Sequence, residues 1–173
     1  MAKHSLRIRK NQLDSIERFF ENKRYRSSVG SKDRQLYWDT YIKFYKNWRW
    51  FRQTWQFERI EDSGGHKLVL FPEYRQSVFK LFRYLPEDYD LEKRNYELLV
   101  KHGYGDLLAR TRFFDQGYCV SQRVQPLKDE EEIPRPLLDL FHDESRENFG
   151  WLNSRIVAVD FDYIDEDKVT SRG

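Results

Sequence analysis

The chain has 173 residues, which is enough for one domain that buries a core without disulfides or structural metals. Its single cysteine, Cys119, rules out an intramolecular disulfide, and we interpret it as a small buried apolar group. Aromatic residues make up 17% of the chain and charged residues 35%. Disordered chains are poor in aromatic residues, so this composition favours folding or docking. No apolar run reaches the roughly 18 residues of a membrane span.

Charge is distributed unevenly along the chain. Residues 1–60 hold fifteen Lys and Arg against six Asp and Glu, whereas residues 129–173 hold five against thirteen. This asymmetry indicates ends that face different partners or each other, although a solvated, self-complementary surface explains it equally well. The basic segment 1–13 lacks the apolar core of a secretory signal. It is compatible with organellar import and also with an exposed basic tail.

The first predicted elements are a helix at 11–24, a loop at 26–32 and a long helix at 33–58. Six aromatic rings recur at intervals of three and four residues on the long helix: Tyr37, Tyr41, Phe44, Trp48, Phe51 and Trp55. This spacing places them on one face of the helix. They either pack into the chain's own core or dock on another subunit. Base stacking between the basic residues is a further interpretation, but rings confined to one face favour packing.

After a break at 63–65, the apolar run 68–71 predicts a short strand. Helices are then expected at 74–84, from the Pro86 turn to Gly103, at 105–115, and from Pro134 to about residue 148. Residues 116–128 resemble a loop, and alternation over 157–163 predicts a second strand. The predicted fold is therefore mainly α, an open arrangement of helices with terminal extensions and at most one or two short strands. Its divisions are a basic extension at 1–32, a helical domain at 33–150 and an acidic extension at 151–173.

The sequence contains no dinucleotide fingerprint, phosphate-cradling glycine loop, metalloprotease helix motif or nucleophile elbow. Four acids near the end, Asp160, Asp162, Asp165 and Asp167, lack the glycine and closing glutamate of an EF-hand loop. We interpret them as a solvated acidic tail. We therefore predict no catalytic residue, no cofactor and no metal site, and a chain that is not an enzyme. An enzyme with an unrecognised site stays open as an alternative, because carboxylate pairs form in space.

Four stretches occur in an order that is similar to one known family. They are Ile42-Lys43-Phe44-Tyr45-Lys46-Asn47, the run VFKLFRYLPED at 78–88, Arg94-Asn95-Tyr96, and the run DEEEIPRPLLDL at 129–140. Together they resemble subunit seven, the ubiquinone-binding protein, of mitochondrial ubiquinol–cytochrome c reductase, which is respiratory complex III. The resemblance implies a helical, non-catalytic accessory subunit on the matrix side of the inner membrane. It also implies peripheral contacts with cytochrome b and the core proteins, a role in assembly for respiratory electron transport, and no haem of its own.

On this interpretation the partners are other subunits of a large membrane complex, with lipid headgroups as further candidates at the basic N-terminal region. The residues expected to dock on those partners are aromatic, basic or at the proline turn: Tyr37, Tyr41, Phe44, Trp48, Phe51, Trp55, Leu85, Pro86, Arg94 and Tyr96. The alternative is a basic-aromatic RNA-binding component of an organellar ribosome or another ribonucleoprotein. The acidic C-terminal third argues against wrapping RNA, so the main interpretation includes no nucleic acid. An adaptor protein is the remaining alternative.

Overall fold

The computed structural model describes residues 31–63, 67–82 and 87–171, with side chains described from residue 43 to 61 in the first range. The predicted helix at 11–24, the side chains of Tyr37 and Tyr41, and the Leu85-Pro86 turn lie outside the described residues. Within them the chain forms eight strands in two antiparallel sheets. The prediction of a mainly α, helical protein is therefore wrong.

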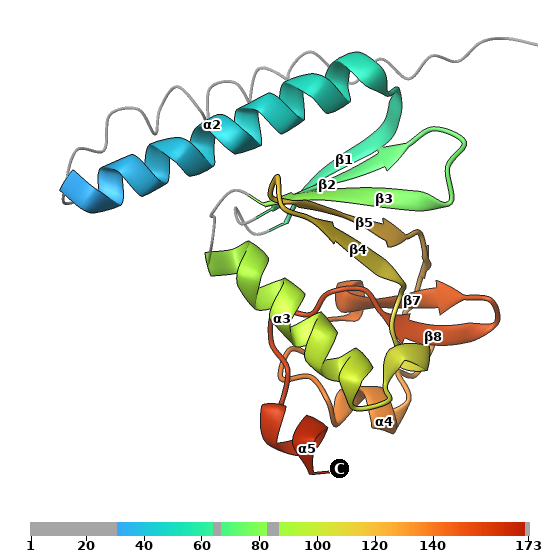
Figure 1. The fold of residues 1–173 in the computed structure, drawn as a ribbon. Helices are drawn as coiled ribbons and strands as arrows, with labels where there is room; N and C mark the ends of the chain where they lie inside the picture. Colours follow the sequence, from blue (N-terminus) through green and yellow to red (C-terminus); the bar gives the residue numbers. More distant parts are fainter. Residues whose placement is uncertain (1–30, 64–66, 83–86, 172–173) are drawn as a thin grey trace, which may run out of the picture.

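The larger sheet is a five-stranded antiparallel unit with strand order β1-β2-β3-β5-β4. Its strands are β1 (Phe57–Ser63), β2 (Lys67–Pro72), β3 (Ser77–Phe82), β4 (Thr111–Phe114) and β5 (Tyr118–Gln122). Helix α2 (Ser31–Thr54) precedes the sheet and crosses one of its faces, as Figure 1 shows. Helix α3 (Glu87–Lys101) and a 3-10 turn (Gly105–Leu107) connect β3 to β4.

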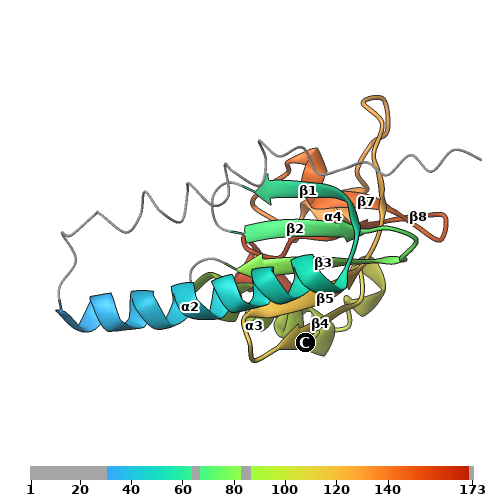
Figure 2. The same ribbon diagram turned by 90° about the horizontal axis from the view of Figure 1, so that it is seen from above.

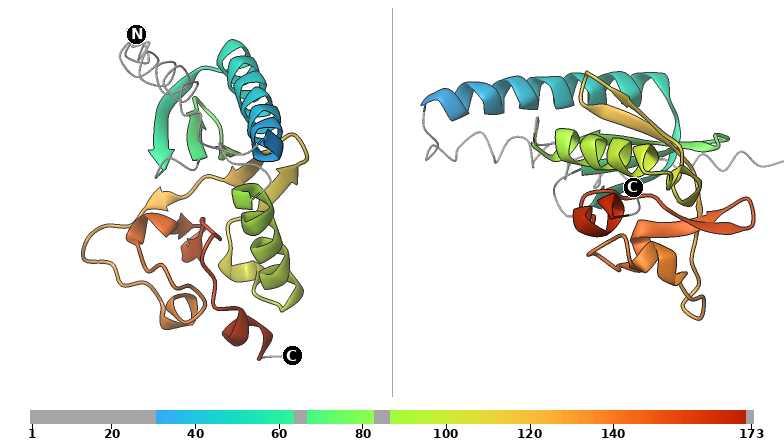
Figure 3. Two further views of the ribbon diagram at one scale, coloured as in Figure 1. Left: turned by 90° about the vertical axis from the view of Figure 1, so that its left-hand side faces the viewer. Right: turned by 60° about the horizontal axis from the view of Figure 1, so that its bottom comes forward.

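A smaller unit follows β5 and lies against the opposite face of the large sheet (Figure 1). It contains the three-stranded sheet of β6 (Gln125–Pro126), β7 (Phe149–Leu152) and β8 (Arg155–Ala158). The short helices α4 (Arg135–Leu138) and α5 (Glu166–Thr170) and a 3-10 turn (Arg146–Asn148) complete it. The view from above shows α2 over the large sheet (Figure 2), and the side view shows the two units stacked (Figure 3). None of the described helices is long and apolar enough to cross a bilayer.

The strands of the large sheet present different residues on their two faces, because successive side chains on a strand alternate. One face packs under α2 through a buried cluster: Phe44, Trp48, Phe51, Phe57, Leu68, Leu70, Phe79 and Leu81. On β2 and β3 the intervening residues point the other way, and Val69 pairs directly with Lys80. The face toward the smaller unit therefore carries Lys67 and Lys80 among apolar neighbours.

A second buried cluster joins α3 to the smaller unit. Its members come from the far end of α3, the connection to β4, α4, β7, β8 and the C-terminal segment: Leu99, Tyr104, Leu108, Leu137, Leu140, Phe141, Phe149, Ile156, Ala158, Phe161, Ile164 and Val169. Residues 151–173, predicted as an acidic extension, contribute five of these side chains. This core fixes the segment after β8 against α3.

Several predicted elements are confirmed and several are wrong. The long helix is α2, although it ends at Thr54 and Phe57 already begins β1. The strand at 68–71 is β2, and the helix after the Pro86 turn is α3. The predicted helix at 74–84 is instead strand β3, and the predicted loop at 116–128 contains β5. The predicted helix at 105–115 is a 3-10 turn at Gly105–Leu107 followed by strand β4. The helix expected to reach residue 148 ends at Leu138. The strand predicted at 157–163 is β8, which begins at Arg155, ends at Ala158 and pairs with β7.

Candidate active site

Two lysines and a glutamate form a buried ion cluster between the large sheet and α3. Lys80 Nζ lies 2.5 Å from Glu92 Oε1, and Lys67 Nζ lies 2.8 Å from Glu92 Oε2. The Glu92 side chain is 0% exposed, that of Lys67 is 3% exposed and that of Lys80 is 5% exposed. Charged residues are almost never fully buried unless they are paired. Strands β2 and β3 and helix α3 thus place three charged groups next to one another inside the protein.

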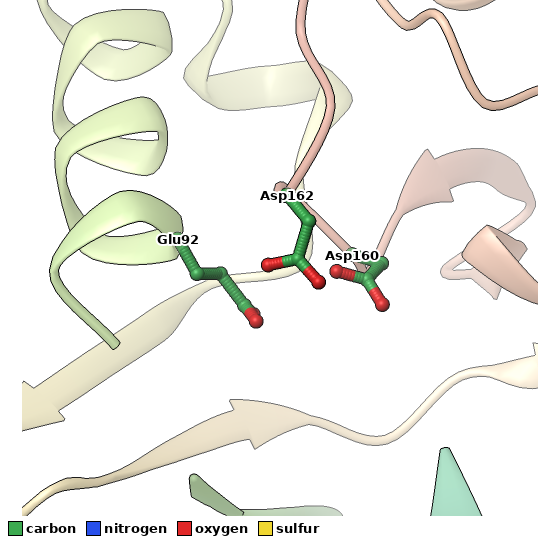
Figure 4. Close-up of side chains that lie close together, drawn as sticks. All are labelled: Glu92, Asp160 and Asp162. Atoms are coloured by element: carbon green, nitrogen blue, oxygen red, sulfur yellow. The ribbon is translucent and has the colours of Figure 1, made fainter. Parts of the chain in front are cut away.

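Two aspartates from the segment after β8 complete this cluster. Lys67 Nζ donates to Asp160 Oδ1 at 2.7 Å and to Asp162 Oδ2 at 2.9 Å. Lys80 Nζ also donates to the Val159 carbonyl oxygen at 2.5 Å, which ties β3 to the same segment. Figure 4 shows Glu92 projecting from α3 toward the two aspartates on the C-terminal segment. The cluster therefore joins both structural units.

The lysines and the aspartates of this cluster have shifted pKa values. Burial opposes the charge of Lys67, but Glu92, Asp160 and Asp162 outweigh it and raise the pKa of that lysine. Burial also disfavours the charged Asp160, yet Lys80 and Lys67 lower its pKa to about 2. Burial and the charges of Asp160 and Glu92 raise the pKa of Asp162 to about 7. Asp160 is therefore the permanently ionised member of the aspartate pair at neutral pH.

Helix α3 reaches this cluster because its buried residues share one face. Tyr89, Glu92, Asn95 and Leu99 recur at intervals of three and four and are all buried. Asn95 Nδ2 donates to the carbonyl oxygens of Phe161 and Asp162, at 2.8 and 3.1 Å. These bonds hold the backbone of the aspartate segment against α3, so the positions of Asp160 and Asp162 are fixed by secondary structure on both sides.

A loop before β7 brings Asp143 and Asn148 to the same region. Ser145 donates to Asp143 Oδ1 through its backbone N–H at 3.0 Å and its hydroxyl at 2.5 Å. These two bonds hold the pKa of Asp143 below its ordinary value. Asn148 Nδ2 donates to the Asp143 carbonyl oxygen at 3.4 Å, and Val159 N–H donates to the Asn148 carbonyl at 2.8 Å. The loop and the strand that leads to Asp160 are therefore connected directly.

These residues line two adjoining cavities between the units. The larger, of about 660 Å³, has an apolar part formed by Val69, Val78 and Phe149. Its polar wall includes Lys67, Lys80, Asn148 and Asp160. The smaller, of about 240 Å³, contains Asp143 and Asp162 and shares four residues with the larger one: Lys67, Glu147, Asn148 and Asp160. An apolar cavity with a few convergent polar groups is the usual form of a small-molecule site.

The oxygen atoms in this region suit a hard divalent cation. Glu92, Asp160 and Asp162 each offer a carboxylate oxygen, and these atoms lie within 4.8 Å of one another. Asp162 Oδ1 is buried and has no hydrogen-bond partner within the described part of the chain. Mg²⁺ is held by one or two carboxylates and by oxygen ligands generally. The donor set therefore fits such an ion chemically.

The predicted docking residues are distributed over several places. Phe44, Trp48 and Phe51 are each 1% exposed, so their rings belong to the chain's own core. Trp55 is partly buried beside Phe79, with their ring centroids 5.6 Å apart. Arg94 is exposed and pairs with Glu166 at 2.7 Å. The Tyr96 hydroxyl accepts from Thr111 N–H at 3.1 Å, and its ring lies 5.1 Å from that of Phe161. The structure does not gather these residues into one surface, and a docking role for them stays a prediction.

Sequence reasoning missed the residues that converge here. Asp160 and Asp162 were predicted to be solvated, but their side chains are only 19% and 23% exposed and both pair with Lys67. Two signals were present in the sequence: an Asp followed five positions later by Asn, at 143 and 148, and an Asp-Phe pair directly after the apolar run 156–159. The buried position of Lys80 is not recognisable in the sequence, because the segment 74–84 resembles a helix and Lys80 would lie on its polar face.

No family model matches this chain, and no curated protein matches it either.

Proposed function

We propose that this chain binds a nucleoside triphosphate in the cleft between its two sheets and transfers the terminal phosphoryl group to a hydroxyl acceptor. One observation supports this function above all. Lys80 lines the same cleft as Asn148 and Asp160 and is held from behind by the fully buried Glu92, with Asp143 in the adjoining cavity. The chemistry of phosphoryl transfer is mostly positioning and electrostatic stabilisation, which this set of groups is able to supply.

The same kinds of groups, in the same chain order, perform phosphoryl transfer in protein kinases. Those enzymes use a strand-β3 lysine paired with a helix glutamate, a loop Asp followed five positions later by Asn, and an Asp-Phe pair that holds the metal. The corresponding residues here are Lys80, Glu92, Asp143, Asn148 and the pair Asp160-Phe161. In this chain Lys80 also lies on the third strand and Glu92 on the helix that follows it. The likeness is therefore one of chain order, secondary structure and spatial convergence.

Three departures from the kinase pattern are visible in the sequence. His142 directly precedes Asp143, with no arginine between them, and Asp162 stands where the Asp-Phe-Gly motif has glycine. The connection between β1 and β2 has only Gly64 and Gly65, fewer glycines than the phosphate-covering loop of kinases. The proposal depends on the residues that would bind the phosphates and the cation and accept the proton, all of which are present. It does not depend on the complete set of kinase motifs.

Each residue has a distinct role in the proposed reaction. Lys80 supplies a positive charge to the phosphates, and Glu92 fixes the position of its ammonium group. Val69, Val78 and Phe149 provide an apolar enclosure for the base. Gln122 at the end of β5 and Val124 in the connection to β6 also line the larger cavity.

Asn148 and Asp160 would hold a divalent cation, with Asp162 beside them. When bound, this ion supplies positive charge that neutralises the phosphate oxygens. Asp143 would accept the proton of the attacking hydroxyl. It is ionised at neutral pH, because its pKa lies below the already acidic value of an ordinary aspartate, and a general base has to be deprotonated before it can act.

Calorimetric titration of the full chain with Mg²⁺ and a non-hydrolysable ATP analogue tests this proposal. The wild-type chain should bind one equivalent, and Lys80→Met should abolish binding because the phosphates lose their buried partner. Lys168→Met, at an exposed lysine of α5, is the matched control and should bind as the wild type does. A folded wild-type chain that binds no analogue, or a Lys80→Met variant that binds it equally well, would refute the proposal.

The accessory-subunit role in complex III and the RNA-binding alternative both stay predictions. The resemblance to subunit seven implied a helical protein, and that fold is wrong, because the described residues form two antiparallel sheets. Lys80 illustrates the difference. It lies in the run that was interpreted as a helix of that family, but it belongs to a buried strand.

A further inference from the structure

Lys67 is a second buried lysine, in addition to the one that pairs with Glu92 from strand β3. Its Nζ atom lies 2.7 to 2.9 Å from one oxygen each of Glu92, Asp160 and Asp162. An ammonium group has three hydrogens to donate, so these three bonds saturate it. The three carboxylates are also the group whose oxygens lie close enough together to hold a metal ion. The ammonium of Lys67 therefore contacts Asp160 and Asp162, the two aspartates at the cation position of the proposed function, and also Glu92, which holds Lys80 as well.

The charges around this position favour exchange of one cation for another. The ammonium groups of Lys67 and Lys80 lie among the carboxyl groups of Glu92, Asp160 and Asp162. Without Lys67 the excess negative charge rises by one unit at a site shielded from water, where charges interact strongly. Such a site attracts a divalent cation more strongly than the intact site does.

Lys67 has room to move away from the carboxylates without leaving the cleft. It is the first residue of β2, and it lines both the larger and the smaller cavity. Lysine is a compact charge on a flexible four-carbon stem, so its ammonium is able to turn while the backbone stays paired in the sheet. The larger cavity is the place of the phosphates in the proposed function.

We propose that Lys67 is an internal counter-ion that occupies the divalent-cation position in the empty cleft and moves onto the phosphates when a cation–nucleotide complex binds. The first half of this inference concerns the metal position alone. The second half rests on the proposed function. Lys67 thus couples cation binding to nucleotide binding. The cation has to displace the Lys67 ammonium group from the carboxylates, and this ammonium group then pairs with the phosphates.

Titration with Mn²⁺ alone, followed by electron paramagnetic resonance of the free ion, tests the first half. Lys67→Met removes the charge while keeping an apolar stem, and it should bind one Mn²⁺ at least about tenfold more tightly than the wild type. Lys67→Arg keeps the charge and should behave as the wild type. The double variant Lys67→Met with Asp160→Asn should lose the gain. Equal Mn²⁺ affinity in the wild type and a folded Lys67→Met variant would overturn the inference.

Nitrogen-15 NMR of the lysine ammonium groups in the wild type tests the same inference. It needs no variant, so it still decides the question if the Lys67→Met chain fails to fold. Saturating Mg²⁺ should shift the Lys67 signal toward that of an exposed lysine, while the Lys80 signal serves as the internal reference. An unmoved Lys67 signal at saturation would overturn the inference. Adding the ATP analogue then tests the second half. A Lys67 response to Mg²⁺ with no nucleotide binding would uphold the cation exchange and reject the proposed function.

Discussion

Glu92 and Lys80 link helix α3 to the large sheet, with Oε1 and Nζ 2.5 Å apart. They are twelve positions apart in the sequence, on either side of the Pro86 turn. Glu92 uses its other oxygen for Lys67 at 2.8 Å, so one buried carboxylate serves two buried ammonium groups. The orientation of α3 and the chemistry of the cleft therefore depend on the same side chain.

Glu92→Gln should destabilise the chain strongly, because it leaves two buried lysines without their common anion. Removing one partner of a buried ion pair costs roughly 3 to 5 kcal/mol. Urea unfolding followed by circular dichroism measures this loss. Glu97→Gln, at an exposed position of the same helix, is the matched control and should change stability by less than about 0.5 kcal/mol. Equal unfolding midpoints for the two variants would contradict a central role for Glu92.

The sequence was informative where one face of a helix is apolar. The rings at intervals of three and four predicted α2, and the Pro86 turn predicted the start of α3, which begins at Glu87. Strand β3 could not be recognised in the same way. Both its faces are buried, one under α2 and one toward α3, so it shows no alternation of apolar and polar residues. Its Lys80 then resembled the polar face of a helix.

The site was harder to predict than the elements because its members are far apart in the chain. Lys67 and Asp160 are separated by 93 positions, yet their charged atoms are 2.7 Å apart. Nothing in the local sequence around Asp160 indicates a buried lysine partner. The spacing from Asp143 to Asn148 was available as a signal, but it becomes informative only when β8 and α3 bring Asp160 and Glu92 beside that loop.

The burial of the aromatic stripe leads to a prediction about stability. Trp48→Ala should destabilise the isolated chain by about 3 to 5 kcal/mol, because the ring is 1% exposed against the sheet and its loss leaves a cavity. Trp50, two positions later, is 52% exposed and contacts Phe51 by its ring edge. Trp50→Ala should therefore cost less than about 1.5 kcal/mol. Chemical denaturation compares them, and a Trp48→Ala chain as stable as the Trp50→Ala chain would contradict the packing of α2.

Gly150 is a close contact point between β7 and the connection that lines the cleft. A Cβ atom at this position would lie 2.3 Å from Val124 Cγ2 and 2.8 Å from the Gln125 carbonyl oxygen. Gly150→Ala should therefore cost about 1 to 3 kcal/mol through overpacking. It should also weaken binding of the ATP analogue, because Val124 lines the larger cavity.

Gly105→Ala is the control for this prediction, since a Cβ there meets nothing within 4 Å. Thermal unfolding and calorimetry of both variants provide the comparison. A Gly150→Ala chain with unchanged melting temperature and analogue affinity would show that β7 and the connection are not in contact.

Cys119 provides a probe of the site's interior, because it pairs with Lys80 across β3 and β5. Its side chain is 0% exposed, and burial, followed by the charge of Glu92, raises the pKa of the thiol. The thiolate is the reactive form, so a raised pKa and burial both suppress modification. The native chain should resist a disulfide reagent at about pH 8, and the urea-unfolded chain should react at the rate of a free cysteine. Rapid modification of the native chain would mean that this part of the sheet is open to solvent.

The last prediction separates nucleotide binding from catalysis at the loop before β7. Asp143 lies in the smaller cavity, beside the cleft proposed for the nucleotide, so Asp143→Asn should leave the affinity for the ATP analogue nearly unchanged. It should lower ADP formation from ATP by about 100- to 10,000-fold, the usual contribution of a general base. Glu144→Gln is the matched control, because this neighbouring carboxylate is exposed and is absent from both cavity walls.

Nucleotide turnover by the two variants is compared with a coupled ADP assay, and affinity is measured separately by calorimetry. Loss of affinity in Asp143→Asn together with loss of turnover would place Asp143 among the binding groups instead. Full turnover in Asp143→Asn would remove it from the reaction altogether. Only unchanged affinity with lost turnover fits a base that is held in the ionised form by Ser145 and acts on an acceptor hydroxyl.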